Sequence, residues 1–422
     1  MSEPTVPAVG CPRTAAMMIV AVFSLSSFVI VEPAPFDLAF IVLAGVLLLR
    51  LHPLLHRDLL LPVAILCGFA LCNAVSGMFA TEIPLMMLFM AVTFFMILVG
   101  VVIFAMVATW PEAADFVLIG YCISSVISTV ITLAAFVGLL PLDMVMFDPS
   151  RVQAFFKDPN VYGPSLVISI LYLMALLERQ PRRPGWWPVI FLALLSLVLG
   201  VVFSASRAAW MNLALSLALY LGLRAWESRG RGAGRYWATV AIVLAVIGGG
   251  SIGVISLTHY GDFIDERAAM QDYDADRFGA QQEGIDIAFR EPLGLGPGQF
   301  EPRVDMHGVS AHSLYVRTIL ENGIAGFVCV FLFFVLTLLV AFRSALIGGP
   351  LAPLGAVVAA SLAGVLVNSA FVDTLHWRSL WIQVGLAWGL YVICMQRQPA
   401  RAALAATHTL GPIVRPFPPL SS

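Results

Sequence analysis

The sequence contains few charged side chains and almost no lysine. Charged residues make up 11% of the 422 positions, hydrophobic residues make up 60%, and Lys157 is the single lysine among the 23 basic residues. So small a charged fraction excludes an ordinary soluble domain. The arginines are dispersed in short clusters rather than gathered on one face, so the sequence predicts no nucleic-acid binding.

Cysteine and histidine are also sparse, and their placement predicts no metal site. The six cysteines lie in or beside apolar runs, and none lies in the long polar segment where an oxidising compartment could cross-link them. The seven histidines are scattered and lack the spacing of a zinc site. Residues 272–283 space their carboxylates like a calcium loop, but Arg277 stands where that loop needs glycine. We therefore expect neither a metal nor another cofactor.

The chain is rich in long apolar runs, and these predict an all-α polytopic membrane protein. Windows of roughly 17–25 apolar residues indicate about twelve transmembrane helices. Most arginines of the short connections fall on the cytoplasmic side if the N-terminus also lies there, as the positive-inside rule requires. The predicted helices lie near residues 15–32, 36–50, 58–77, 84–108, 115–138, 161–177, 187–204, 208–223, 237–257, 324–342, 352–371 and 379–396.

The same pattern divides the chain into five parts. The first apolar stretch lacks a small-residue cleavage site, so we interpret it as a retained helix rather than a signal peptide. The polar segment after the ninth span carries an excess of carboxylates and should form a cap outside the membrane. The predicted parts are a cytoplasmic tail at 1–14, spans 1–9 at 15–257, a periplasmic loop with short helices at 258–323, spans 10–12 at 324–396 and a cytoplasmic tail at 397–422.

His312 is the candidate catalytic base within this polar segment. The spacing of the apolar residues after it predicts a short helix that starts at His312 and stops at Asn322-Gly323. The partial positive charge at a helix N-terminus disfavours an imidazolium, so the ring should be neutral near pH 7. The alternative is a histidine that caps or packs at the start of the helix.

Two further patterns concern the loop helices and their neighbours. Phe278, Ile285 and Phe289 share one helical stripe, which predicts an earlier helix that lies on top of the bundle. Arg317 and Glu321 are four residues apart and should form an ion pair. The segment His376-Trp-Arg378 could border a substrate path or anchor the chain at the membrane interface.

Five basic residues are candidates for binding an anion. Arg207 is the only charged residue between Pro184 and Leu223, and it lies at a tight turn on the outer side. An arginine at the membrane edge needs a ligand, an acidic partner or water. Together the five would form an electropositive surface suited to pyrophosphate, although simple binding of lipid headgroups is an alternative. The other four are Arg151, Lys157, Arg277 and Arg290.

Several short motifs occur in a fixed order between about residues 145 and 395. They are Phe156-Lys-Asp-Pro-Asn160, Ser206-Arg-Ala-Ala-Trp210, Pro292-Leu-Gly-Leu-Gly-Pro-Gly298, and His312-Ser313 followed by Gly323-Ile-Ala-Gly326. This combination resembles the bacterial O-antigen ligase superfamily, which also includes O-antigen and exopolysaccharide polymerases. The combination is more specific than any single motif.

The resemblance implies a metal-independent glycosyltransferase with a GT-C-like bundle in the bacterial inner membrane and an active face in the periplasm. It implies transfer of a glycan from undecaprenyl pyrophosphate to a hydroxyl on another glycan or on lipid A core, in O-antigen, lipopolysaccharide or exopolysaccharide assembly. Arg207 and Arg277 would hold the pyrophosphate, and His312 would be the base. The motifs do not separate ligase from polymerase.

A transporter or flippase of lipid-linked sugars is the alternative in a different functional class. Transporters tend to have two similar halves and to place polar residues in the middle of their spans. The polar residues of this chain are instead concentrated at one outer surface. We therefore favour the enzyme.

Overall fold

The computed structural model describes most of the membrane bundle but not all of the polar segment. Most of the predicted span at 237–257 lies outside the described residues, and so do residues 258–271 and 304–311 of the predicted periplasmic loop. The described ranges are 10–48, 59–148, 151–179, 184–228, 272–303 and 312–409, with isolated positions between 237 and 256.

Nearly all described elements are helices, which confirms the predicted helical class. A short antiparallel pair, β1 with β2, interrupts them. The elements are α1 (Arg13–Phe23), α2 (Pro35–Leu48), α3 (Leu60–Gly77), α4 (Ile83–Thr109), α5 (Ala113–Phe136), η2 (Leu142–Met144), β1 (Met146–Asp148), β2 (Arg151–Val152), α6 (Pro159–Ser165), α7 (Val167–Arg179), η3 (Pro184–Trp186), α8 (Trp187–Phe203), α9 (Arg207–Glu227), α12 (Asp272–Arg290), α13 (Phe300–Arg303), α14 (Leu314–Leu346), α15 (Ala352–Asn368) and α16 (Arg378–Thr409).

Within the described ranges, seven helical segments are long and apolar enough to cross a membrane. They are α3, α4, α5, the combined segment Pro159–Arg179, α9, α14 and α16. The shorter apolar helices α1, α2, α8 and α15 coincide with further predicted windows. The chain is thus a helical membrane protein, whereas the predicted total of about twelve spans stays a prediction.

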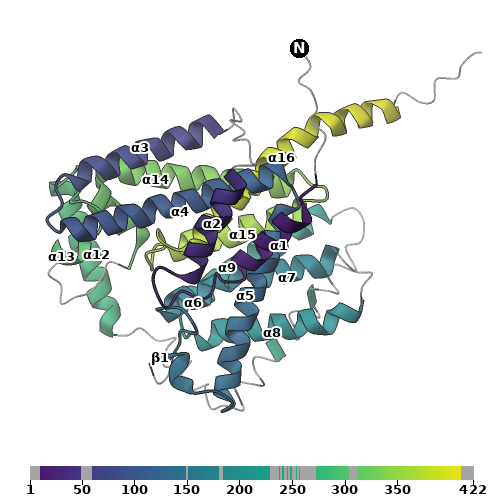
Figure 1. Ribbon diagram of the computed structural model, residues 1–422, viewed down its shortest axis with the longest axis horizontal. Helices are drawn as coiled ribbons and strands as arrows, with labels where there is room; N and C mark the ends of the chain where they lie inside the picture. Colours follow the sequence, from purple (N-terminus) through teal and green to yellow (C-terminus); the bar gives the residue numbers. More distant parts are fainter. Residues whose placement is uncertain are drawn as a thin grey trace, which may run out of the picture.

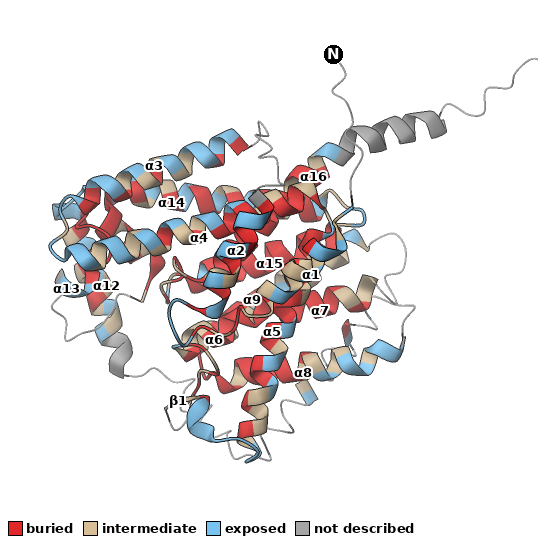
Figure 2. Ribbon diagram, in the orientation of Figure 1, coloured by how far each residue is buried: buried red, intermediate tan, exposed pale blue. Residues whose placement is uncertain are grey.

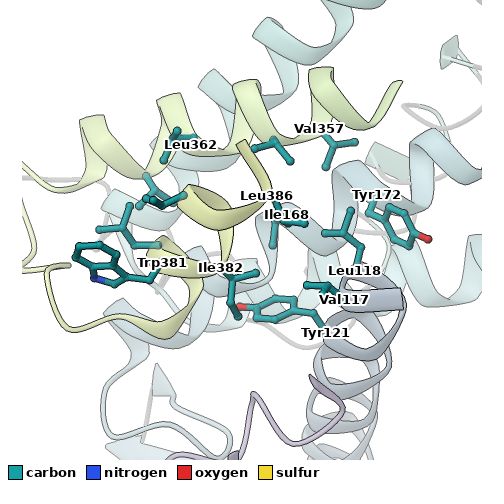
Figure 3. Close-up of a cluster of buried hydrophobic side chains, with 14 of the residues drawn as sticks. Val117, Leu118, Tyr121, Ile168, Tyr172, Val357, Leu362, Trp381, Ile382 and Leu386 are labelled. Atoms are coloured by element: carbon teal, nitrogen blue, oxygen red, sulfur yellow. The ribbon is translucent and has the colours of Figure 1, made fainter. Parts of the chain in front are cut away.

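The centre of the bundle is built around α15 and the first half of α16. Figure 3 shows Val357 and Leu362 of α15 in one buried cluster with Trp381 and Ile382 of α16 and with side chains of α5 and α7. In Figure 2, α15 and the start of α16 are buried, while many residues along α3 and α4 are exposed. Exposed apolar side chains on outer helices are what contact with lipid requires.

Small residues let α15 lie close to α9. A methyl group added to Gly364 would lie 2.2 Å from Oδ1 of Asn212 and 2.0 Å from Oγ of Ser216. Close backbone approach through small residues is a general device of helix packing in membranes. The C-terminal part of α15 is therefore held against the N-terminal part of α9.

The helix α14 is broken at Gly323. Backbone groups beside the break form hydrogen bonds with the segment Pro292–Gly298, which lies between α12 and α13. Gly323 has φ 71° and ψ 177°, which is not helical. The amide of Ile324 donates to the carbonyl of Pro292, and the amide of Leu295 donates to the carbonyl of Leu320, both at 3.0 Å. The predicted stop at Asn322-Gly323 is thus a break inside a longer helix.

The helix α12 packs on α14 through a face other than the apolar stripe seen in the sequence. Phe278, Ile285 and Phe289 are all exposed, whereas Ala280 and Ala288 are buried. Gly284 lies between these alanines on the same face, next to Phe300 and Val316. The helix was predicted correctly, but small residues rather than large ones make its contact.

Figure 1 shows α12 and α13 at the end of the bundle where α3 passes into α4.

Replacing Gly294 tests how much the stability of the protein depends on the contact between the segment Pro292–Gly298 and the break at Gly323. Gly294 has φ +87°, and a methyl group added there would lie 2.5 Å from the carbonyl oxygen of Glu321 and the amide nitrogen of Gly323. We expect Gly294→Ala to lower the free energy of unfolding by about 1–3 kcal/mol through backbone strain, and the steric overlap should add to this loss. The measurement is thermal unfolding in detergent.

Gly222→Ala is the matched control, because Gly222 lies within α9 and a methyl group there meets nothing within 4 Å. This change should leave stability equal or slightly higher, since alanine favours a helix. Equal unfolding temperatures for the two variants would contradict the role assigned to the break.

Candidate functional site

Four of the described segments meet at one end of the bundle. A methyl group on Gly163 of α6 would lie 2.5 Å from Oγ of Ser204 and 2.7 Å from Cβ of Ala209, so the start of α6 abuts the turn between α8 and α9. The amide of Leu314 donates to the carbonyl of Ser369 at 2.9 Å, which joins the start of α14 to the end of α15. Asp158, the residue before α6, acts on the pKa of His312, which lies two residues before α14, so the two pairs of segments belong to one region.

His312 lies just outside the helix that it was predicted to begin. The helix α14 begins at Leu314, and the N-cap is Ser313, whose hydroxyl accepts from the amide of Val316 at 3.4 Å. The predicted start at His312 is therefore wrong by two residues. Serine is the better cap because its short side chain reaches the free amides of the first turn. His312 itself has φ +43°, a backbone conformation that non-glycine residues rarely adopt.

The surroundings of His312 favour its neutral form. Burial is the largest cause that lowers the pKa of the imidazole, and the positive charge of Arg277 is the next. Asp158 and Asp373 act in the opposite direction, and Arg317 acts with Arg277. The direction agrees with the sequence prediction, but burial and Arg277 replace the helix terminus as the causes.

These electrostatic contacts show which predicted residues the fold brings together. Arg277 of α12 lies within electrostatic range of His312, although 35 positions separate them in the sequence. Arg207 is the first residue of α9, after the N-cap Ser206, whose side chain accepts from the amide of Ala209. The turn that carries Arg207 is the one that abuts α6, so Arg207 lies at the same end of the bundle.

The other three basic candidates are placed differently. The guanidinium of Arg151 donates to Oδ1 of Asn160 at 3.1 Å. The ammonium of Lys157 lies 2.8 Å from a carboxylate oxygen of Glu32, and both side chains are about half exposed. Arg290 is exposed at the end of α12, and 13 residues of helix separate it from Arg277 by roughly 20 Å. Arg277 and Arg290 therefore cannot bind the same phosphate.

Arg317 forms the predicted ion pair with Glu321 and also contacts two further carboxylates. Its guanidinium lies 3.0 Å from Oε1 of Glu321 and 2.9 Å from Oδ2 of Asp373, and it also pairs with Glu301. The side chain of Arg317 is buried, and the ring of Phe300 lies beside its guanidinium. Sequence reasoning missed Asp373 and Glu301 because no short-range pattern links them to Arg317.

The three side chains of His376-Trp-Arg378 have separate environments. Nε2 of His376 lies 2.9 Å from Oγ1 of Thr93. Trp377 is buried. Arg378 forms two hydrogen bonds with the carboxylate of Asp37, at 2.7 and 2.5 Å. Arg378 thus joins α16 to α2, and His376 is the residue of this segment that borders the site.

Removal of Arg317 tests whether the buried ion network stabilises this end of the bundle. We expect Arg317→Ala to lower the free energy of unfolding by about 3–5 kcal/mol, because it leaves the buried Glu321 and the partly buried Asp373 without their cation. Thermal unfolding in detergent measures the effect. Arg13→Ala is the control, since Arg13 is exposed at the start of α1 and its loss should change stability by less than about 0.5 kcal/mol. An equally small effect for both variants would contradict the stabilising role.

Comparison with protein-family models gives a match to O-antigen ligase over residues 191–331. The matched range includes Arg207, Arg277 and His312, and it ends inside α14. Comparison with curated proteins gives no match. The family match confirms the resemblance to the O-antigen ligase and polymerase superfamily.

Proposed function

Because residues 191–331 match the O-antigen ligase family, we propose that this chain is a metal-independent glycosyltransferase of the bacterial inner membrane. It transfers a glycan from undecaprenyl pyrophosphate to a hydroxyl acceptor at the periplasmic face, during O-antigen, lipopolysaccharide or exopolysaccharide assembly. The observation that carries the proposal is that a partly buried histidine, His312, lies within electrostatic range of a cation, Arg277, at one end of the bundle.

The base of the reaction is His312. The acceptor alcohol must lose its proton as it attacks, and a neutral imidazole within hydrogen-bond reach can take that proton. Burial and the charge of Arg277 keep the imidazole neutral near pH 7, where it is able to act. The attacking oxygen forms a bond to the anomeric carbon, and the bond from that carbon to the phosphate oxygen breaks in the same step.

The departing pyrophosphate is stabilised by Arg207 and Arg277. Pyrophosphate leaves with additional negative charge, and fixed guanidinium groups stabilise charge where it develops. Arg277 serves both parts of the reaction, because the cation that holds the leaving group also disfavours protonation of the base. Arg151 and Lys157 lie near the start of α6 and remain candidates for binding the donor, with Lys157 paired to Glu32, while Arg290 is too distant to share the phosphates.

The proposal covers both a ligase, with lipid A core as acceptor, and a polymerase, with a lipid-linked glycan as acceptor. The alternative of a transporter or flippase for lipid-linked sugars has less support. Residues 191–331 match the O-antigen ligase family, and the family match favours an enzyme over a transporter.

Replacement of His312 tests the assignment of the base. His312→Ala should lower glycan transfer by about 10²–10⁴-fold, because it removes the proposed general base. The measurement is transfer by purified protein, with binding of the lipid-linked donor as the control that the site remains folded. Near-normal transfer by the variant would remove His312 from the mechanism.

The pH dependence of transfer tests the coupling between Arg277 and His312. The acid limb of the rate profile should lie below the ordinary histidine pKa of about 6.5. The positive charge of Arg277 disfavours the imidazolium, so Arg277→Gln should raise the pKa of His312 and move the acid limb to higher pH. Rates measured with saturating donor separate this shift from weaker donor binding.

Arg13→Gln controls for loss of a positive charge far from the site and should leave the acid limb in place. An acid limb that moves to lower pH in Arg277→Gln, or moves equally in both variants, would contradict the coupling.

A further inference from the structure

A second histidine, His376, borders the ion network around Arg317. Its ring meets the ring of Phe89 edge to face, with centroids 5.3 Å apart, and the guanidinium of Arg317 lies 5.7 Å from the centroid of the same ring. Asp373 and Arg317 act on the pKa of His376 and also on that of His312. The two histidines therefore border the same ion pair.

The contact with Thr93 determines which nitrogen of His376 carries the proton. The hydroxyl of Thr93 donates to the carbonyl of Phe89 at 2.9 Å and lies 2.9 Å from Nε2 of His376. A hydroxyl has one proton, so both hydrogen bonds form only if Nε2 donates to the Thr93 oxygen. Burial lowers the pKa of His376, so the ring is neutral near pH 7 and its Nδ1 has no proton.

The bare Nδ1 is positioned to accept a hydrogen bond from a ligand. Among the described residues, His376 forms a hydrogen bond with Thr93 and a ring contact with Phe89, and neither uses Nδ1. The side chain is partly exposed, so a ligand can reach it. A neutral nitrogen with a lone pair requires a partner that donates a proton, such as a hydroxyl group.

The charges beside His376 favour the same kind of ligand. One guanidinium, that of Arg317, is surrounded by the carboxyl groups of Glu301, Glu321 and Asp373. The carboxylates of Glu301 and Asp373, which are at least partly exposed, outnumber the single guanidinium and would repel a phosphate, whereas sugar hydroxyls donate readily to them. The basic residue Arg277 instead acts on His312 from α12. The site thus has a basic side for pyrophosphate and an acidic side for a hydroxylated acceptor.

We propose that Nδ1 of His376 accepts a hydrogen bond from a hydroxyl group of the acceptor glycan and so holds the acceptor next to His312. This inference rests on the proposed function. It assigns the acidic side of the Arg317 network, with Asp373 and Glu301, to the acceptor. It also gives a role to His376, which lies in the connection between α15 and α16.

Two substitutions separate the roles of the two ring nitrogens. Asparagine places its amide oxygen near the position of Nδ1, whereas glutamine places its amide group near that of Nε2. We expect His376→Gln to raise the KM for the acceptor by about tenfold, the effect of losing one hydrogen bond to the substrate. The kcat at saturating acceptor and the KM for the donor should stay within about twofold of wild type. His376→Asn should keep a near-normal acceptor KM.

The assay uses purified full-length protein in detergent or liposomes. The donor is an undecaprenyl-pyrophosphate-linked repeat unit, and the acceptors are lipid A core oligosaccharide and, in a separate reaction, the same lipid-linked repeat unit. The His312→Ala variant serves as the contrast, because it should lower kcat instead of raising the acceptor KM. A structural role for His376 would change kcat and both KM values in both variants.

Thr93→Val provides a second measurement if the His376 variants fold poorly. Valine keeps the shape of Thr93 but removes the acceptor for Nε2, so the proton distributes over both nitrogens and the acceptor KM should rise about twofold. An unchanged acceptor KM in Thr93→Val and His376→Gln, or an equal rise in His376→Gln and His376→Asn, would overturn the inference alone. No transfer by the wild-type protein would overturn the proposed function and this inference with it.

Discussion

The break in α14 is the constraint on which the candidate site depends. Gly323 leaves backbone groups of the helix without their usual partners, and such groups are costly at the edge of a membrane. The segment Pro292–Gly298 supplies those partners through hydrogen bonds to Leu320, Glu321 and Ile324. Just after this segment, Oε1 of the buried Gln299 accepts hydrogen bonds from the amides of Thr81 and Glu82. These bonds attach the segment to the start of α4. The glycine motifs of the sequence are therefore explained by packing, and their effect is to hold α12, with Arg277, beside His312.

The charges around His312 divide the site into two chemically different sides. Arg277 lowers the pKa of His312 and provides the cation for a pyrophosphate, whereas Asp373 acts on His312 in the opposite sense. Arg317 keeps Asp373 and Glu321 together next to the start of α14. Glycan transfer needs a basic place for the leaving group and a place rich in hydrogen-bond acceptors for the incoming alcohol, with the base between them. The arrangement proposed here meets that need with side chains from α9, α12, α14 and the connection before α16.

Every predicted transmembrane window in the described ranges contains a helix. The sequence predicted these helices well because an apolar run of this length is typical of a membrane-spanning helix. The start of α14 was misplaced because the spacing of apolar residues within a helix does not mark its first residue. Ser313, rather than His312, caps the helix. The contact face of α12 was also missed. The stripe of large residues is exposed, and the helix packs instead through Gly284, which lies next to Phe300 and Val316. The pairs Asp373 with Arg317 and Thr93 with His376 are formed by residues far apart in the chain, and such contacts have no signal in a single sequence.

The central claim is that Arg207, Arg277 and His312 act on one lipid-linked donor. The most direct test is a structure of the His312→Ala variant determined with an undecaprenyl-pyrophosphate-linked glycan bound, since this variant should bind the donor without consuming it. The account predicts that the two phosphates contact the guanidinium groups of Arg207 and Arg277, with the anomeric carbon facing position 312. A pyrophosphate bound away from both arginines, or a sugar facing away from position 312, would contradict it.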